Sequence, residues 1–152
     1  QEGLPEDWDT VIDTNIKGLL YTTGLLLPEM IARGQGHIVN IGSVAGHWVY
    51  PKGAVYCASK FAVRALNEGL RMDLNGTGIR VTSISPGMVQ TDFSEVRLGS
   101  KALGDAVYAR RNPLLPKDIS ETVLWCIQRP AHVNIQEIIL YPTEQASVTL
   151  FK

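Results

Sequence analysis

Three short runs that each contain several β-branched residues alternate with longer stretches in which apolar residues recur at helical spacing. The runs lie at residues 37–42, 79–85 and 135–141. Short apolar runs bounded by glycine or proline are typical of strands buried on both faces of a parallel sheet, and we expect this of the first two. Alternating strands and helices, with no repeat, low-complexity segment or linker, predict a single α/β domain over residues 1–152.

The first helical stretch begins at Pro5, with proline and acidic residues in its first turn. Pro28 is predicted to kink or divide this helix, and the Gly-Gln-Gly of residues 34–36 to end it. Asn15 lies on its apolar stripe, so we expect its amide either to make an interhelical hydrogen bond or to mark a local helix break. A last helix is predicted over residues 117–128, with four apolar side chains directed inward, namely Ile119, Val123, Leu124 and Ile127.

Tyr56 and Lys60 are spaced to project side by side from a second helix, predicted to start near Gly53 and to end near Asn75 and Gly76. A phenol with a pKa of about 10 is a poor acid or base at neutral pH unless its anion is favoured. A unit charge at about 4 Å, with an effective dielectric of about 20, supplies about 4 kcal/mol, or about three pKa units. We therefore expect Lys60 to bring the pKa of Tyr56 close to neutral, the alternative being an ordinary surface pair on a helix.

Groups that could bind a ligand follow the carboxyl ends of the first two predicted strands. Ser43 comes directly after the first run, and Pro86 and Gly87 stop the second. Ligands of open α/β sheets collect outside the carboxyl ends of strands, so the Ser43 hydroxyl is well placed to meet a substrate unless it only caps a turn. The backbone amides of residues 88–91 and the Thr91 hydroxyl could hold a carboxamide or a phosphate, with a plain strand-to-helix turn as the alternative.

Two further segments carry side chains suited to a substrate pocket. In the loop 44–52, three rings could wall such a pocket or pack within the loop: His47, Trp48 and Tyr50. Residues 92–112 have the weak, mixed pattern of a mobile lid. Its basic side chains either grip a substrate carboxylate or are solvated surface charges, and they are Arg97, Lys101, Arg110 and Arg111.

Composition limits the classes of function. The 152 residues are 45% hydrophobic and 19% charged, with a net charge of −1, which is typical of one soluble globular domain. Because there is no basic run and no apolar run of about 20 residues, we expect no nucleic-acid partner, no membrane span and a cytosolic, that is cytoplasmic, location. Cys57, Cys126 and the three histidines lack metal-site spacing, so we expect core thiols and no metal site. The start at Gln1 leads us to expect a piece of a longer protein.

One set of residues resembles the short-chain dehydrogenase/reductase family in order and spacing. The set consists of Asn15, Ser43, Tyr56-Cys57-Ala58-Ser59-Lys60 beginning thirteen residues after Ser43, and Pro86-Gly87 with Thr91. The resemblance runs over the whole chain. It implies an α/β fold with a Rossmann-like, doubly wound parallel sheet and helices on both faces.

The resemblance also implies a role for each residue. Tyr56 would be the acid or base that exchanges a proton with the substrate alcohol or carbonyl, and Ser43 would hold that substrate oxygen. Lys60 would lower the pKa of Tyr56 and bind the nicotinamide ribose, while Asn15 would position a water that links Lys60 to solvent. Besides Tyr56 and Lys60, the residues that would line the nicotinamide and its carboxamide are Pro86, Gly87, Met88, Val89 and Thr91.

Residues 129–135 and 142–145 are similar to the branch of NADP-dependent serine and 3-hydroxy acid dehydrogenases. This implies NADP as the cofactor, with NAD as the other option, and a homotetramer in which the Asn15 and Tyr56 helices pack against their mates. The family's glycine-rich phosphate loop and its Asn-Asn-Ala-Gly segment are missing from the sequence. The chain therefore looks like the carboxyl-terminal part of such a domain, without the amino-terminal strands. Alone it should have exposed sheet edges and little cofactor affinity.

The function implied is that of an oxidoreductase that transfers a hydride between a nicotinamide cofactor and a small-molecule secondary alcohol or ketone, such as a 3-hydroxy acid. The alternative is a non-catalytic module of the same fold, kept for oligomerisation or ligand sensing. The complete set of Asn15, Ser43, Tyr56 and Lys60 favours the enzyme, because a module freed from chemistry has no need for all four. The identity of the substrate is left open.

Overall fold

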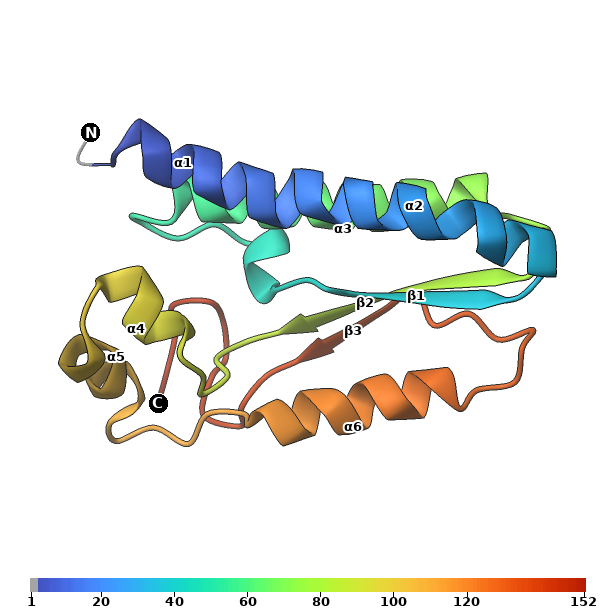
Figure 1. The fold of residues 1–152 in the computed structure, drawn as a ribbon. Coiled ribbons are helices and arrows are strands. Elements are labelled where there is room, and N and C mark those ends of the chain that lie inside the picture. Colours follow the sequence, from blue (N-terminus) through green and yellow to red (C-terminus); the bar gives the residue numbers. More distant parts are fainter. Residues whose placement is uncertain (1–2) are drawn as a thin grey trace.

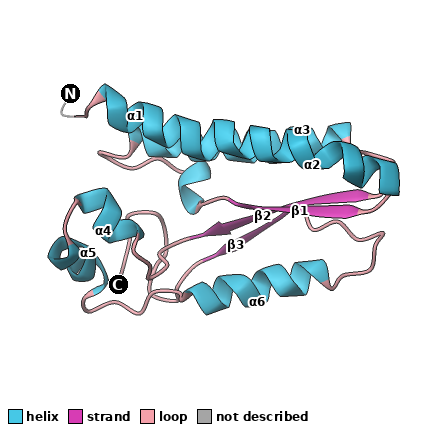
Figure 2. Cartoon of the chain, viewed as in Figure 1, coloured by secondary structure: helices cyan, strands magenta, loops and turns pink. Residues whose placement is uncertain are grey.

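The structure is a computed structural model that describes residues 3–152. It has three layers, with α1, α2 and α3 on one face of a parallel sheet and α6 on the other (Figures 1 and 2). This confirms the predicted α/β fold with helices on both faces. In chain order, the elements are α1 Pro5–Ile12, a π-helical turn Asp13–Lys17, α2 Gly18–Arg33, β1 Gly36–Ile41, a 3-10 turn Val44–Gly46, α3 Ala54–Asp73, β2 Ile79–Pro86, α4 Phe93–Leu98, α5 Lys101–Tyr108, α6 Pro116–Ile127 and β3 Glu137–Leu140.

The three strands are parallel and lie in the order β1-β2-β3. In register, Ile41 of β1 pairs with Ile84 of β2, and Pro86 of β2 pairs with Leu140 of β3. Their carboxyl ends point to the same edge of the sheet, where the 3-10 turn, α4 and α5 lie (Figure 1). Any ligand site of this sheet is therefore expected at that edge.

The predicted burial on both faces is right for β2 and wrong for β1. Every residue of β2 except Arg80 is buried, whereas the side chain at the end of β1, Ile41, is 48% exposed. Among the described residues β1 is one of the two edge strands of the sheet, and α6 lies over the other side of the sheet from α2 and α3. Two residues of α6 expected to face inward, Leu124 and Ile127, are also exposed, at 53% and 47%.

The main apolar core lies between the sheet and the α2–α3 layer. Its buried residues are Leu74, Ile79 and Val81, with partly buried neighbours at Leu27, Met30, Ile38 and Leu70. Both cysteines are buried and free, as expected of core thiols.

The first helix is interrupted at Asn15 and not at Pro28. Pro28 lies inside α2, which continues to Arg33, so Pro28 does not divide the helix. The break is instead the π-helical turn Asp13–Lys17, with Asn15 at its centre. Gly34 ends α2 in the left-handed conformation, with φ 64°, as expected of a glycine at that position.

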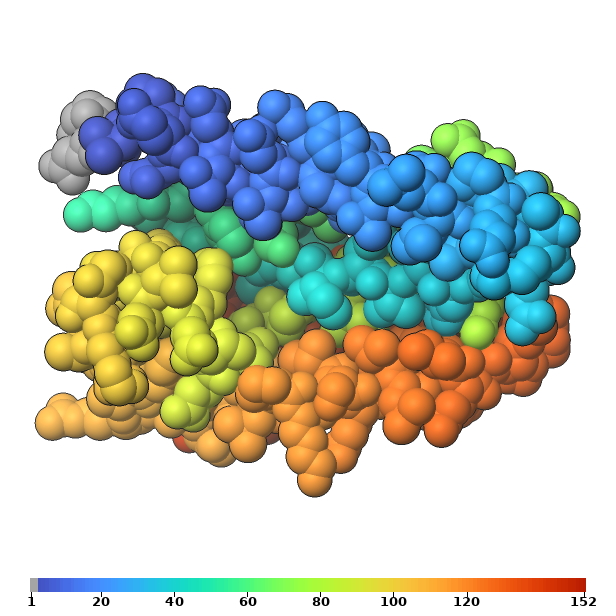
Figure 3. Space-filling view, viewed as in Figure 1, coloured from blue at the N-terminus to red at the C-terminus, as the bar shows by residue number. Residues whose placement is uncertain are grey.

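The predicted lid forms two short helices, α4 and α5, at the carboxyl edge of the sheet, where Figure 3 shows them in yellow. Tyr108 joins the lid to the loop before it. Its hydroxyl accepts a hydrogen bond from Ser94 Oγ at 2.8 Å and donates to the Thr91 carbonyl at 3.2 Å. In residues 3–152, no helix has both the length and the apolar character that a membrane crossing requires.

Candidate active site

Tyr56 and Lys60 lie in the first two turns of α3 and point to the same side of the helix, as their spacing predicts. The ammonium nitrogen of Lys60 is 5.9 Å from the centre of the Tyr56 ring. It donates a hydrogen bond of 3.0 Å to the carbonyl of Ile41, the last residue of β1. Lys60 therefore bridges α3 and the carboxyl end of the sheet.

Burial shifts the pKa values of this pair. It raises the pKa of Tyr56 above its usual value, and a hydrogen bond with the Ser43 side chain opposes that rise. Burial also lowers the pKa of Lys60. The expectation that Lys60 brings the pKa of Tyr56 close to neutral is therefore wrong for this chain, because the cost of burying a phenolate outweighs the attraction of an ammonium directed at Ile41. Tyr56 keeps its proton at neutral pH and can act as a proton donor.

Ser43 both caps a turn and contacts Tyr56. Its Oγ accepts a hydrogen bond of 3.1 Å from the Ala45 amide at the start of the 3-10 turn Val44–Gly46. That turn packs closely on α3, because a Cβ at Gly46 would lie 2.8 Å from the carbonyl oxygen of Lys60. Ser43 caps this turn, and the cap does not prevent its hydroxyl from also meeting a substrate.

Asn15 meets both expectations for a polar residue on an apolar stripe. It lies in the π-helical turn, and its Nδ2 donates a hydrogen bond of 3.0 Å to Ser59 Oγ on α3. Ser59 Oγ in turn donates to the backbone carbonyl of Tyr56 at 2.7 Å. Asn15 is thereby linked through Ser59 to the helical turn that carries Tyr56.

The loop after β2 is more fully bonded than its sequence indicates. The Met88 amide donates to Gln145 Oε1 at 2.8 Å, and the Gln90 amide donates to the Leu114 carbonyl at 2.8 Å. Within the described part of the chain, the Val89 amide has no hydrogen-bond acceptor. Of the amides in residues 88–90, that of Val89 is therefore the one left to hold a ligand.

Three contacts at the site were not predicted. The ring of Phe93, on α4, lies 5.4 Å from the ring of Tyr56. His47 Nε2 lies 2.7 Å from Glu137 Oε1, which also accepts a hydrogen bond of 2.6 Å from Ser85 Oγ. The partners in these contacts are 37, 90 and 52 residues apart in sequence, and local pattern contains no signal for such pairings.

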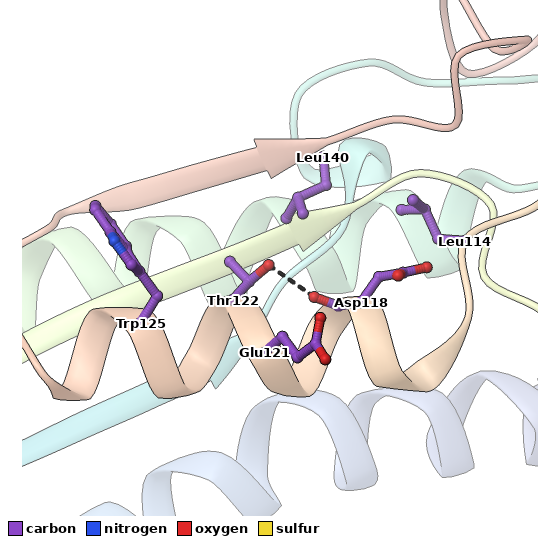
Figure 4. Close-up of a pocket in the computed structure, with 6 residues that line it drawn as sticks. All are labelled: Leu114, Asp118, Glu121, Thr122, Trp125 and Leu140. Carbon is purple, nitrogen blue, oxygen red and sulfur yellow. Dashed lines mark hydrogen bonds between the residues drawn. The ribbon is translucent and has the colours of Figure 1, made fainter.

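A separate hollow of about 460 Å³ lies between α6 and the sheet (Figure 4). Thr122 in its wall bonds to the Asp118 carbonyl at 2.7 Å. The remaining lining residues are Leu114, Glu121, Trp125 and Leu140. None of the predicted site residues lines it, so it is distinct from the site around Tyr56. In the described residues, no three His, Cys, Asp or Glu side chains gather as they would around a metal ion.

Comparison with known proteins places the chain among related sequences. A family model described as short chain dehydrogenase matches residues 1–100. The NADP-dependent 3-hydroxy acid dehydrogenase YdfG of Salmonella typhi is 49% identical over 143 residues, covering 93% of this chain and 58% of the relative. Sulfoacetaldehyde reductase 2 of Chromohalobacter salexigens is 49% identical over 142 residues, covering 92% of this chain and 56% of the relative.

Solved structures agree with these sequences. The closed form of a serine dehydrogenase complexed with NADP+ has a TM-score of 0.94 and 46% identity, over 98% of this chain and 61% of that one. Serine dehydrogenase from Escherichia coli has a TM-score of 0.79 and 43% identity, over 95% of this chain and 57% of that one. The chain thus spans less than two thirds of the length of these relatives.

Proposed function

The chain belongs to the short-chain dehydrogenase family, and from this membership we propose that the whole protein is a nicotinamide-dependent oxidoreductase that interconverts a small alcohol and its carbonyl. The observation that carries the proposal is the half-buried Tyr56 side chain, whose ring centre lies 5.9 Å from the ammonium nitrogen of Lys60 one helical turn away and whose pKa is affected by the neighbouring Ser43 side chain. The names of the relatives refer to a 3-hydroxy acid, serine and sulfoacetaldehyde. We therefore propose a substrate that carries an acid group, with a 3-hydroxy acid as the leading candidate.

The side chains of this proposal have distinct tasks. Tyr56 gives its proton to a carbonyl oxygen in reduction and takes it back from the alcohol in oxidation. Ser43 holds that oxygen beside Tyr56, so that the proton moves over a short distance. When bound, the nicotinamide ring supplies or accepts the hydride.

The residues present fit the nicotinamide end of the cofactor. Lys60 makes one hydrogen bond with an ammonium that has three donors, which leaves donors for ribose hydroxyls. The free Val89 amide and the Thr91 hydroxyl suit a carboxamide, next to a wall formed by Pro86, Gly87 and Met88. We propose NADP over NAD because NADP appears in the names of the relatives.

Asn15 is proposed to hold the water that connects Lys60 to solvent. Support comes from its amide group, because Nδ2 is bonded to Ser59 and no donor in the described residues reaches Oδ1. That oxygen can accept a hydrogen bond from water. The π-helical turn would then place the acceptor beside α3, where an unbroken helix would direct it elsewhere.

The protein is further proposed to be a cytosolic homotetramer, assembled through α2 and α3. Large apolar side chains on the outer face of α2 are exposed, among them Leu25 at 81% and Tyr21 at 68%. Such a surface is typical of a subunit interface. The two buried free thiols agree with a reducing compartment.

The test is Tyr56→Phe in the full-length protein, which removes one hydroxyl and keeps the ring. Loss of a general acid lowers kcat by about 100-fold or more, measured as NADPH consumption with a carbonyl substrate. Tyr21→Phe, the same change at a tyrosine on the outer face of α2, should leave kcat unaltered, because it lies away from the site and keeps the ring that would meet a neighbouring subunit. Turnover by Tyr56→Phe within a few-fold of wild type would favour the non-catalytic module instead.

A further inference from the structure

Arg97 is the basic residue of the lid whose charge acts on Tyr56. Lys101 pairs with Asp105 at 3.5 Å on α5. Arg111 stacks on the ring of Phe151 at 4.1 Å, beside the last residue of the chain. Arg97 instead projects from α4 toward the loop that precedes α3, with its guanidinium carbon 5.4 Å from the ring centre of Tyr50.

One face of α4 is directed at the active site. Phe93 and Arg97 are four residues apart, so they share that face. Phe93 contacts the Tyr56 ring, and Arg97 contacts the Tyr50 ring six residues upstream. In Figure 3 the yellow surface of α4 adjoins the green surface of α3. The position of Arg97 over the site thus follows from the packing of the whole helix.

The charge of Arg97 has no acidic partner among the described residues. None of the five ion pairs in residues 3–152 includes it. Its effect is felt at the site, because burial raises the pKa of both Tyr56 and Tyr50 while the Arg97 charge opposes the rise in each. The side chain stays exposed, which leaves its N–H groups accessible to a small ligand.

We propose that Arg97 binds the acid group of the substrate, a carboxylate or a sulfonate, while Tyr56 and Ser43 hold the oxygen that reacts. This inference rests on the proposed function. A guanidinium presents parallel N–H donors that match the two oxygens of such a group. Tyr50 forms the floor of this subsite, because its ring supports the guanidinium. The subsite selects small hydroxy acids over neutral alcohols of the same shape.

The experiment uses the full-length protein with NADP and two probes, 3-hydroxybutyrate and its methyl ester, which lacks the negative charge and carries one additional methyl group. Arg97→Met should lower kcat/KM for 3-hydroxybutyrate on the order of 10- to 100-fold, mainly through KM, and leave the ester within about threefold. Arg97→Lys keeps the positive charge but lacks the parallel N–H donors of a guanidinium. This variant should retain part of the preference for 3-hydroxybutyrate over its ester. Lys101→Met removes a positive charge from the same lid and should leave kcat/KM unchanged for both probes.

Each outcome separates this inference from the function on which it rests. Equal losses on both probes with Arg97→Met, or no loss on either, would show that Arg97 does not bind the acid group. Turnover of the ester by Arg97→Met demonstrates that the variant is folded and that Tyr56 still acts. A wild-type protein that oxidises neither these probes nor L-serine overturns the proposed function, and the Arg97 subsite with it.

Discussion

At the scale of single residues, burial disfavours the charged forms of both Tyr56 and Lys60. The pKa of Tyr56 is raised and that of Lys60 is lowered, each chiefly through loss of water. Charged groups at this site are therefore costly, and each must be compensated by a specific contact. For the Lys60 ammonium that contact is the Ile41 carbonyl, whereas the protonated Tyr56 phenol carries no charge.

His37 gives a second case in which burial decides protonation. Thr82 Oγ1 donates its hydrogen to the Ile135 carbonyl, so His37 Nε2, at 2.7 Å, must donate to Thr82. Nδ1 is then unprotonated, and it is buried without a hydrogen-bond partner among the described residues. Burial, assisted by the charge of Arg80, lowers the pKa of His37 from 6.5 to about 4.

We therefore predict that His37 makes the folded state less stable in acid. Its folded pKa lies below its unfolded pKa, so the neutral ring favours folding above 6.5, and this contribution is lost as pH falls from 6.5 to about 4. After allowance for solvent screening, the loss is about 1 kcal/mol. His37→Gln keeps a donor for Thr82 and should flatten the decline of the melting temperature with pH, whereas exposed His132→Gln should not. Equal pH slopes in wild type and His37→Gln would contradict this.

The sequence predicted the residues whose role follows from local spacing. Ser43, Tyr56 and Lys60 lie together because four residues make one helical turn and because strands of a parallel sheet end at one edge. Phe93 and Arg97 could not be singled out, since they meet the site only through the packing of α4, whose pattern is weak. The raised pKa of Tyr56 could also not be predicted from the sequence, because it depends on how several elements together bury the side chain.

At the scale of elements, Arg80 joins β2 to the carboxyl end of α6. Its guanidinium donates to the carbonyls of Cys126 at 3.3 Å, Ile127 at 3.1 Å and Arg129 at 3.2 Å. Carbonyls in the last turn of a helix have no partner within the helix, and a positive charge there is also favoured by the helix dipole. The Arg80 side chain of the sheet thus caps the carboxyl end of α6, a helix in a different layer.

Replacement of Arg80 by Met should destabilise the full-length protein by about 2 kcal/mol, because several carbonyls lose a charged donor. The urea dependence of the free energy of unfolding measures this. Arg33→Met is the matched control, since Arg33 makes only an exposed pair with Glu29, worth less than about 1 kcal/mol. If the two variants unfold at the same urea concentration, Arg80 does not hold α6.

Sequence pattern predicted the kind and order of most elements but not how each is covered. Pro28 was expected to divide a helix that continues through it, and Asn15, the actual break, could be read in two ways. Ile41 and Leu124 have the composition of buried residues and are exposed here, because burial depends on neighbours that the pattern of one segment does not contain.

At the scale of the whole molecule, the outer face of α2 is an apolar surface of the kind that another subunit covers in an oligomer. Tyr21 and Leu25 are four residues apart on this face, and both are largely exposed. We predict that Tyr21→Asp combined with Leu25→Asp lowers the oligomeric state of the full-length protein, measured by light scattering after size-exclusion chromatography. Leu103→Asp, on α5, should leave the assembly intact. An unchanged mass for the double variant would place the interface elsewhere.

All the groups assigned here to the substrate lie at one edge of the sheet, between Ser43 and Arg97, while the glycine-rich phosphate loop of the family is not part of this sequence. We therefore propose that the preference for an alcohol and the preference between NAD and NADP are encoded in different stretches of polypeptide. A chimera that joins this chain to the first half of another family member should inherit its choice of alcohol from one parent and its choice between NAD and NADP from the other. Divergence of one preference would then leave the other untouched.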